Sequence, residues 1–172
     1  MHRRGKIVWS LALAIACLSA ACGLQPSTTS FDDQLTSLEE LSPAAQEDDR
    51  PLRVVATINI LGDVIANIGG DSIELTTILP MGADPHAYQM TASDLQALRQ
   101  ADIVLLNGLG LEESMHSSLL QFAEQVPMVS ASEGIEGLVF GQENEGQVDE
   151  AEHQRDIDPH VWMDPTQVMI WV

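Results

Sequence analysis

From residue 52 onward, short apolar runs alternate with segments whose apolar residues recur three or four positions apart. The runs are rich in β-branched residues and predict strands at 53–58, 73–79, 103–106 and 127–129. The segments between them predict helices over about 60–68, 91–101 and 111–122. Strands that alternate with helices at short intervals indicate an α/β fold, a parallel sheet flanked by helices on both faces.

The first 51 residues lack this alternation and predict export. Residues 1–6 are basic, and the apolar run over 7–21 is shorter than the roughly 20 residues of a membrane-spanning helix. This pattern predicts a signal peptide over residues 1–21. Its end, Leu18-Ser19-Ala20-Ala21-Cys22-Gly23, resembles the lipobox of bacterial lipoproteins, with Ser19 where Leu is more usual. We therefore predict a lipid on Cys22, with simple secretion as the alternative.

Composition divides the remaining chain and restricts its chemistry. Residues 22–51 are polar and predict a flexible tether, and 52–163 form the α/β unit, with an acidic loop at about 141–157. Asp164 and Pro165 are typical of a helix start, so 164–172 predict the beginning of a helix that the chain leaves incomplete.

The net charge of −19 argues against nucleic-acid binding. Cys17 lies in the predicted signal peptide and Cys22 directly follows it, and the chain has no other cysteine, which excludes thiolate chemistry in the folded part.

The tripeptide Asp-Pro-His occurs twice, at 84–86 and at 158–160. Proline restricts the backbone on both sides, so the imidazole that follows has less conformational entropy to lose. The neighbouring carboxylate can accept the imidazole N–H, which leaves the other ring nitrogen as a better metal ligand. A single loop histidine is more often structural or merely exposed, but the repetition favours a metal site. We predict His86 and His160 as ligands, supported by Asp84 and Asp158.

Two other histidines in the mature chain are weaker candidates. His116 follows Met115 on the third predicted helix and is expected to face solvent. His153 lies in the acidic loop, where a solvated run of charges is the simpler interpretation.

Several motifs together resemble the solute-binding proteins of zinc and manganese ABC importers, a family of metal-binding lipoproteins. They are Leu79-Pro80-Met81-Gly82-Ala83-Asp84-Pro85-His86-Ala87-Tyr88, Ser93-Asp94-Leu95, Asn107-Gly108-Leu109-Gly110-Leu111-Glu112 and Asp158-Pro159-His160-Val161-Trp162-Met163-Asp164-Pro165. The resemblance implies two lobes joined by a long helix, with the metal bound between them. His86 and His160 match the two ligands of the first lobe. The other two ligands, a His or Glu and an Asp, come from the second lobe and have no counterpart in this sequence.

The resemblance therefore implies the N-terminal lobe of a two-lobe receptor whose linking helix and second lobe are absent. It predicts a monomeric, non-enzymatic protein outside the cytoplasm, anchored to the bacterial membrane through Cys22. The protein would bind Zn²⁺ or Mn²⁺ and deliver it to an importer permease. A metal-dependent hydrolase with an open site is one alternative, although Glu112 or Glu113 are only arbitrary choices for its base. A surface adhesin with a structural metal is another.

Overall fold

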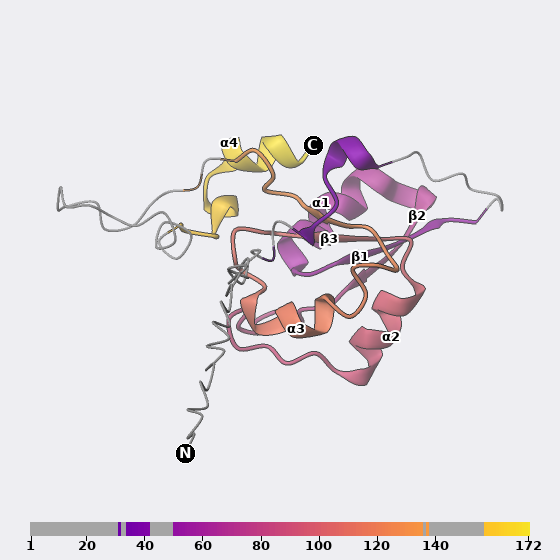
Figure 1. Ribbon diagram of the computed structural model, residues 1–172. Helices are drawn as coiled ribbons and strands as arrows, with labels where there is room; N and C mark the ends of the chain where they lie inside the picture. Colours follow the sequence, from indigo (N-terminus) through magenta and orange to yellow (C-terminus); the bar gives the residue numbers. More distant parts are fainter. Residues whose placement is uncertain (1–30, 32–33, 42–49, 136, 138–156) are drawn as a thin grey trace, which may run out of the picture.

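The computed structural model describes residues 31, 34–41, 50–135, 137 and 157–172. Within these residues, four parallel strands form one sheet in the order β2-β1-β3-β4 (Figure 1). The strands are β1 (Leu52–Ala56), β2 (Ile73–Thr77), β3 (Ile103–Leu106) and β4 (Met128–Ser130). The predicted α/β fold with a parallel sheet is confirmed. The predicted signal peptide, Cys22 and most of the acidic loop lie outside the described residues.

The longer described helices are α1 (Asn59–Gly69) and α2 (Ala92–Gln100), and α3 (His116–Leu119) and α4 (Pro165–Val168) are single turns. Short 3₁₀ helices occur at Leu38–Glu40, Gly70–Ser72, Glu113–Met115, Val161–Met163 and Met169–Trp171. The start of α2 is the predicted cap, in which Thr91 and Asp94 each accept the backbone N–H of the other. None of the described helices is both long enough and apolar enough to cross a membrane.

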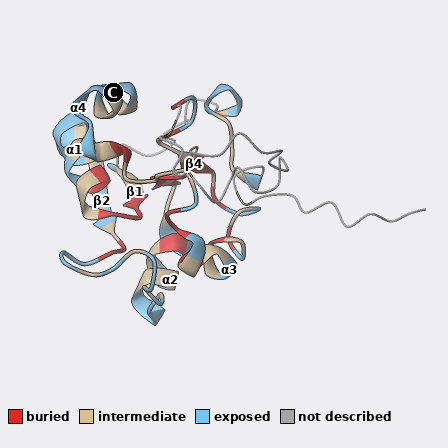
Figure 2. Cartoon of the chain, turned by 90° about the vertical axis from the view of Figure 1, so that its left-hand side faces the viewer, coloured by how far each residue is buried: buried red, intermediate tan, exposed pale blue. Residues whose placement is uncertain are grey.

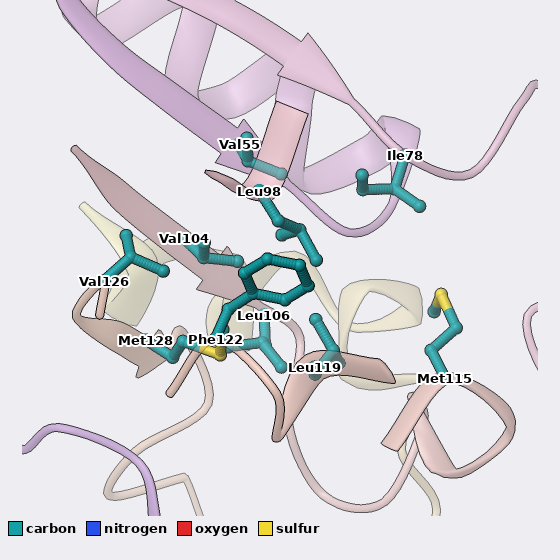
Figure 3. Close-up of a cluster of buried hydrophobic side chains, with 10 residues drawn as sticks. All are labelled: Val55, Ile78, Leu98, Val104, Leu106, Met115, Leu119, Phe122, Val126 and Met128. Carbon is teal, nitrogen blue, oxygen red and sulfur yellow. The ribbon is translucent and has the colours of Figure 1, made fainter. Parts of the chain in front are cut away.

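The sheet separates two hydrophobic clusters, because successive side chains of a strand point to opposite faces. Val104 and Leu106 of β3 belong to the first cluster, which also contains Leu98 of α2 and side chains in and around α3 (Figure 3). Leu105 instead packs against the second cluster, which includes Leu61 of α1 and is contacted by Trp171. Buried positions accordingly occur in β1, β3 and β4, on the helix sides that face the sheet and in the segments that follow the strands, whereas β2 has none (Figure 2).

The third predicted helix is much shorter than the pattern of apolar residues indicates. Leu111, Met115 and Leu119 are fully buried as expected, but only α3 and the 3₁₀ turn before it are helical. Within this segment, the Ser114 hydroxyl donates to the carbonyls of Pro85 and Tyr88 in a neighbouring loop. Contacts with neighbouring loops override the helical periodicity of this segment.

Part of the predicted tether packs against the sheet. Phe31 and Leu35 contact the first cluster, and the N–H of Thr36 donates to the carbonyl of Met128 over 2.7 Å. These contacts differ from the flexible tether expected over 22–51. Their physical basis is twofold: two apolar side chains leave water, and the outer edge of β4 gains a hydrogen-bond partner.

The described residues on either side of the acidic stretch lie next to each other. A Cβ placed on Gly137 would collide with the side chain of Ile157, so this side chain packs directly against the backbone of Gly137. Residues 138–156, which include most of the predicted acidic loop, lie outside the described residues. After it, Asp164 caps α4 by accepting the N–H of Thr166, as the sequence predicts.

Candidate metal site

Both Asp-Pro-His sequences lie at the carboxyl edge of the parallel sheet, where such sheets commonly bind ligands. His86 belongs to the loop between β2 and α2, and His160 directly precedes the 3₁₀ helix Val161–Met163. The amide of Asn107, the residue after β3, donates to the carbonyl of Pro159 over 2.9 Å. The hydroxyl of Ser114 donates to the carbonyl of Pro85 over 2.8 Å. The two loops are thus held to the same part of the fold.

Each tripeptide forms the same local turn. Oδ1 of Asp84 accepts the N–H of His86 over 2.9 Å, and Oδ1 of Asp158 accepts the N–H of His160 over 3.0 Å. An Asp side chain that bonds the backbone two residues later is a common turn, which the intervening proline further restricts. Both imidazoles are therefore presented from closely similar backbone turns.

The fold brings the two imidazoles together, although they are separated by most of the domain in sequence. Their Nε2 atoms lie 3.4 Å apart, the ring centroids are 5.5 Å apart and the ring planes are inclined by 65°. The ring of Trp162 packs edge-on against His160, with the centroids 5.2 Å apart. The side chain of His86 is exposed and that of His160 is about half-buried.

The two aspartates differ in how they contact the rings. Oδ1 of Asp158 lies 2.6 Å from Nδ1 of His160, whereas the hydrogen bond of Asp84 is made to the backbone of His86. The backbone N–H of His160 and, after it, the His160 ring lower the pKa of Asp158 below its ordinary value. When Nδ1 of His160 donates to this carboxylate, Nε2 is left with a lone pair for a ligand.

A pocket of about 210 Å³ adjoins His160. It is lined by Gly137, Asp158, His160, Val161, Met163, Asp164 and Gln167. Two carboxylates and one imidazole give it a lining suited to a cation. Across the residues that the structure describes, no group of three or more His, Cys, Asp or Glu side chains is placed to hold a metal ion. The arrangement therefore offers two converging nitrogen donors in an acidic setting.

A buried carboxylate lies beneath the two loops. Glu112 is only 2% exposed, and it accepts hydrogen bonds from the Thr57 hydroxyl (2.6 Å) and the backbone N–H groups of Asn107 (2.8 Å) and Gly108 (3.1 Å). Burial raises the pKa of Glu112, and these three hydrogen bonds oppose that rise. Because its oxygens are already engaged and shielded from water, Glu112 anchors the segment after β3 and does not reach a substrate.

Sequence reasoning did not single out Asn107 and Ser114, because nothing in their local pattern indicates which carbonyl each will contact. Asn107 directly follows an apolar strand and begins one of the motifs that carry the family resemblance, but neither signal indicates its partner. The expectation for His116 was wrong: it is half-buried, and its ring packs against that of Phe31 with centroids 4.5 Å apart. His153 lies outside the described residues.

Comparison with curated proteins finds relatives along most of the chain. The manganese-binding lipoprotein MntA of Halalkalibacterium halodurans is 34% identical over 97% of this chain and 47% of its own length. The manganese ABC transporter substrate-binding lipoprotein PsaA of Streptococcus pneumoniae is 32% identical over 92% of this chain and 46% of its own. The chain thus spans about half the length of these relatives.

Solved structures share the fold. The Mn-bound periplasmic metal binding protein of Candidatus Liberibacter asiaticus matches with a TM-score of 0.59 and 28% identity, over 70% of this chain and 41% of its own. The match extends to a crystal structure of ZnuA, with a TM-score of 0.56 and 25% identity, over 70% of this chain and 43% of its own. The family model described as zinc-uptake complex component A periplasmic, ZnuA, matches residues 54–172. The chain belongs to this ZnuA family.

Proposed function

We propose that the chain binds a transition-metal ion, Zn²⁺ or Mn²⁺, through Nε2 of His86 and of His160. The bound ion is the cargo of an ABC importer, and the protein delivers it to the permease from outside the cytoplasm. Asp158 supports the site by holding the His160 ring, and Asp84 by fixing the turn that presents His86.

The separation of the two Nε2 atoms is the observation that carries this proposal. Two nitrogens bound to a tetrahedral zinc ion at about 2.0–2.1 Å are about 3.3–3.4 Å from each other. The Nε2 atoms of His86 and His160 are 3.4 Å apart. The rings therefore need little rearrangement to share an ion. Imidazole suits zinc well, whereas manganese usually takes more oxygen ligands.

The names of the relatives support the transport part of the proposal. MntA and PsaA are named as manganese-binding and ABC transporter substrate-binding lipoproteins, and the family description refers to zinc uptake. These relatives are substrate-binding proteins and not enzymes. We propose that the present chain likewise has no turnover, which agrees with the burial of Glu112, one of the bases considered for a hydrolase. Membrane anchoring through a lipid on Cys22 and a monomeric state belong to the same proposal.

Metal binding by the stripped chain tests the proposal directly. We expect Zn²⁺ affinity, measured by competition with a chromophoric chelator, to fall at least about tenfold in His86→Ala and in His160→Ala, since each removes a ligand. The variant His153→Ala controls for loose binding by the acidic segment and should bind like the parent. Binding should release protons and weaken on acidification, because a ligating imidazole must be neutral. Equal affinity in the parent and both ligand variants would refute the proposal.

Delivery and anchoring need experiments in the cell. Deletion of the gene should impair growth when zinc or manganese is scarce, and added metal should restore it. A Cys22→Ser variant should lose incorporation of labelled fatty acid. Growth that is insensitive to metal but defective in surface attachment would favour the adhesin alternative instead.

A further inference from the structure

The segment Asn107–Ser114 donates one hydrogen bond to each histidine loop, in both cases to the carbonyl of the proline before the histidine. Nδ2 of Asn107 donates to the carbonyl of Pro159, and Oγ of Ser114 donates to the carbonyl of Pro85. Each carbonyl belongs to the peptide unit that joins the proline to its histidine. A hydrogen bond there fixes the peptide plane directly before the imidazole-bearing residue. Both ends of the segment Asn107–Ser114 therefore act immediately next to a proposed ligand.

This segment is itself held firmly. The carboxylate of Glu112 ties it to Thr57 at the end of β1 and closes its turn onto the N–H groups of Asn107 and Gly108. Gly108 adopts a φ of 84°, and a Cβ there would collide with Ser130 at the end of β4. Asn107 is completely buried. The segment is thus fixed to the ends of three neighbouring strands and is suited to serve as a rigid reference for the two loops.

The imidazoles cannot hold themselves in place. The contact between their Nε2 atoms, at 3.4 Å, is longer than the usual 2.7–3.2 Å of a protein hydrogen bond and is correspondingly weak. The Asp158 contact orients only the His160 ring. The distance between the two loops must therefore be fixed by the backbone, and the bonds from Asn107 and Ser114 join both loops to one support.

We infer that the segment Asn107–Ser114 sets the separation of His86 and His160, and that Asn107 and Ser114 are positioning residues for metal capture. This inference rests on the proposed function, but its structural part can be measured without metal. Ordering two loops before the ion arrives reduces the entropy that binding must overcome. The alternative is that both hydrogen bonds serve only the stability of the fold.

The test uses the full chain and three variants. Ser114→Ala removes one donor, Ser114→Thr keeps the hydroxyl as the matched control, and Asn107→Leu removes the other donor at similar volume. In metal-free protein with labelled histidine, nuclear Overhauser contacts between the two imidazoles report their separation, because the centroids lie 5.5 Å apart. Co²⁺ titration then reports affinity and, through its visible spectrum, coordination geometry.

We expect the contact between the rings to weaken in Ser114→Ala and Asn107→Leu and to persist in Ser114→Thr, with Co²⁺ affinity about tenfold lower in the first two. If Asn107→Leu does not fold, Ser114→Ala decides the matter. Unchanged ring contacts and an unchanged Co²⁺ spectrum in folded Ser114→Ala would overturn the inference. A parent protein that binds Co²⁺ no better than His86→Ala would instead refute the proposed function, and the ring contacts would still test the positioning.

Discussion

Asp84 and Asp158 occupy the same place in two identical tripeptides, yet their carboxylates have different roles. Both accept the N–H of the histidine two residues later, but only Asp158 also lies within hydrogen-bond distance of the imidazole. A carboxylate behind a ligating histidine fixes its tautomer and raises its basicity. In the proposed site, the His160 ring is therefore oriented more completely than the His86 ring.

Replacing each aspartate by asparagine separates these two roles. Asparagine keeps the oxygen that accepts the backbone N–H but removes the charge beside the ring. We expect Asp158→Asn to lower Zn²⁺ affinity about tenfold, the lower end of the effect of such supporting groups. Asp84→Asn serves as the matched variant and should lower it much less. Equal losses of Zn²⁺ affinity in the two variants, measured by chelator competition, would show that the contact between Asp158 and the His160 ring does not contribute to binding.

The sequence predicts the two histidines of the candidate site but not the residues that support their loops. A repeated tripeptide is visible without any structure, and so is the carboxylate next to each histidine. Asn107 and Pro159 are 52 positions apart, and Ser114 and Pro85 are 29 apart, so their hydrogen bonds depend on how the elements pack. The contact between the two rings could not be predicted either, because it depends on the register of several strands.

At the scale of the elements, Asp102 joins the entry points of two neighbouring strands. Its carboxylate accepts hydrogen bonds from the guanidinium of Arg50 (2.6 and 2.8 Å), from the backbone N–H of Arg53 (2.8 Å) and from the Arg53 side chain (3.1 Å). The Arg50 contact, followed by those of Arg53, holds the pKa of Asp102 far below its ordinary value. Asp102 thereby fixes the start of β1 beside the start of β3.

The low pKa of Asp102 predicts a specific pH dependence of stability. The unfolded chain takes up this proton near pH 4, whereas the folded protein resists it to much lower pH. The stabilisation by Asp102 is therefore complete above about pH 5 and is lost as the pH falls towards the folded-state value. In urea unfolding, the midpoint difference between the parent and Asp102→Asn should be largest near neutral pH and shrink below about pH 4.

Asp71→Asn, at an exposed aspartate, controls for the loss of one negative charge from an acidic protein. A difference between the parent and Asp102→Asn that stays constant across this pH range would contradict the assignment of the ion pairs.

Most elements of the lobe are predictable because their apolar residues recur at one consistent spacing. The strands and the first two helices follow this rule, and the cap formed by Thr91 and Asp94 is visible in the sequence. The segment after β3 does not follow it, since Glu112 and Ser114 make long-range contacts that fit a turn better than a long helix. Tertiary contacts overrule local preference where the loops of the candidate site are anchored.

At the scale of the whole molecule, the polar N-terminal region contributes to the core. Phe31 and Leu35 pack against the first cluster, and Phe31 also contacts the ring of His116. The N–H of Thr36 covers part of the outer edge of β4, which would otherwise be available for pairing with another chain. A polar composition alone therefore does not show that a segment is detached from the fold.

Truncation of either apolar side chain measures this contribution. We expect Phe31→Ala and Leu35→Ala each to lower the free energy of unfolding by about 1 kcal/mol, because both side chains are only partly buried. Leu38→Ala is the matched control, since Leu38 is 56% exposed, and it should change stability by less than about 0.5 kcal/mol. Urea unfolding monitored by circular dichroism provides the comparison. Unchanged midpoints for Phe31→Ala and Leu35→Ala would show that the segment does not pack on the core in solution.

The close approach of Gly137 and Ile157 has a practical consequence. Because the side chain of Ile157 packs against Gly137, we expect that the sequence between these two residues can be exchanged or lengthened without displacing Asp158 and His160. Closing a longer loop costs little, about 0.6 kcal/mol for each doubling of its length. A fluorescent protein or an affinity tag inserted there would lie within a short distance of the proposed metal site. The same position offers a graft point for turning the domain into a genetically encoded sensor of metal.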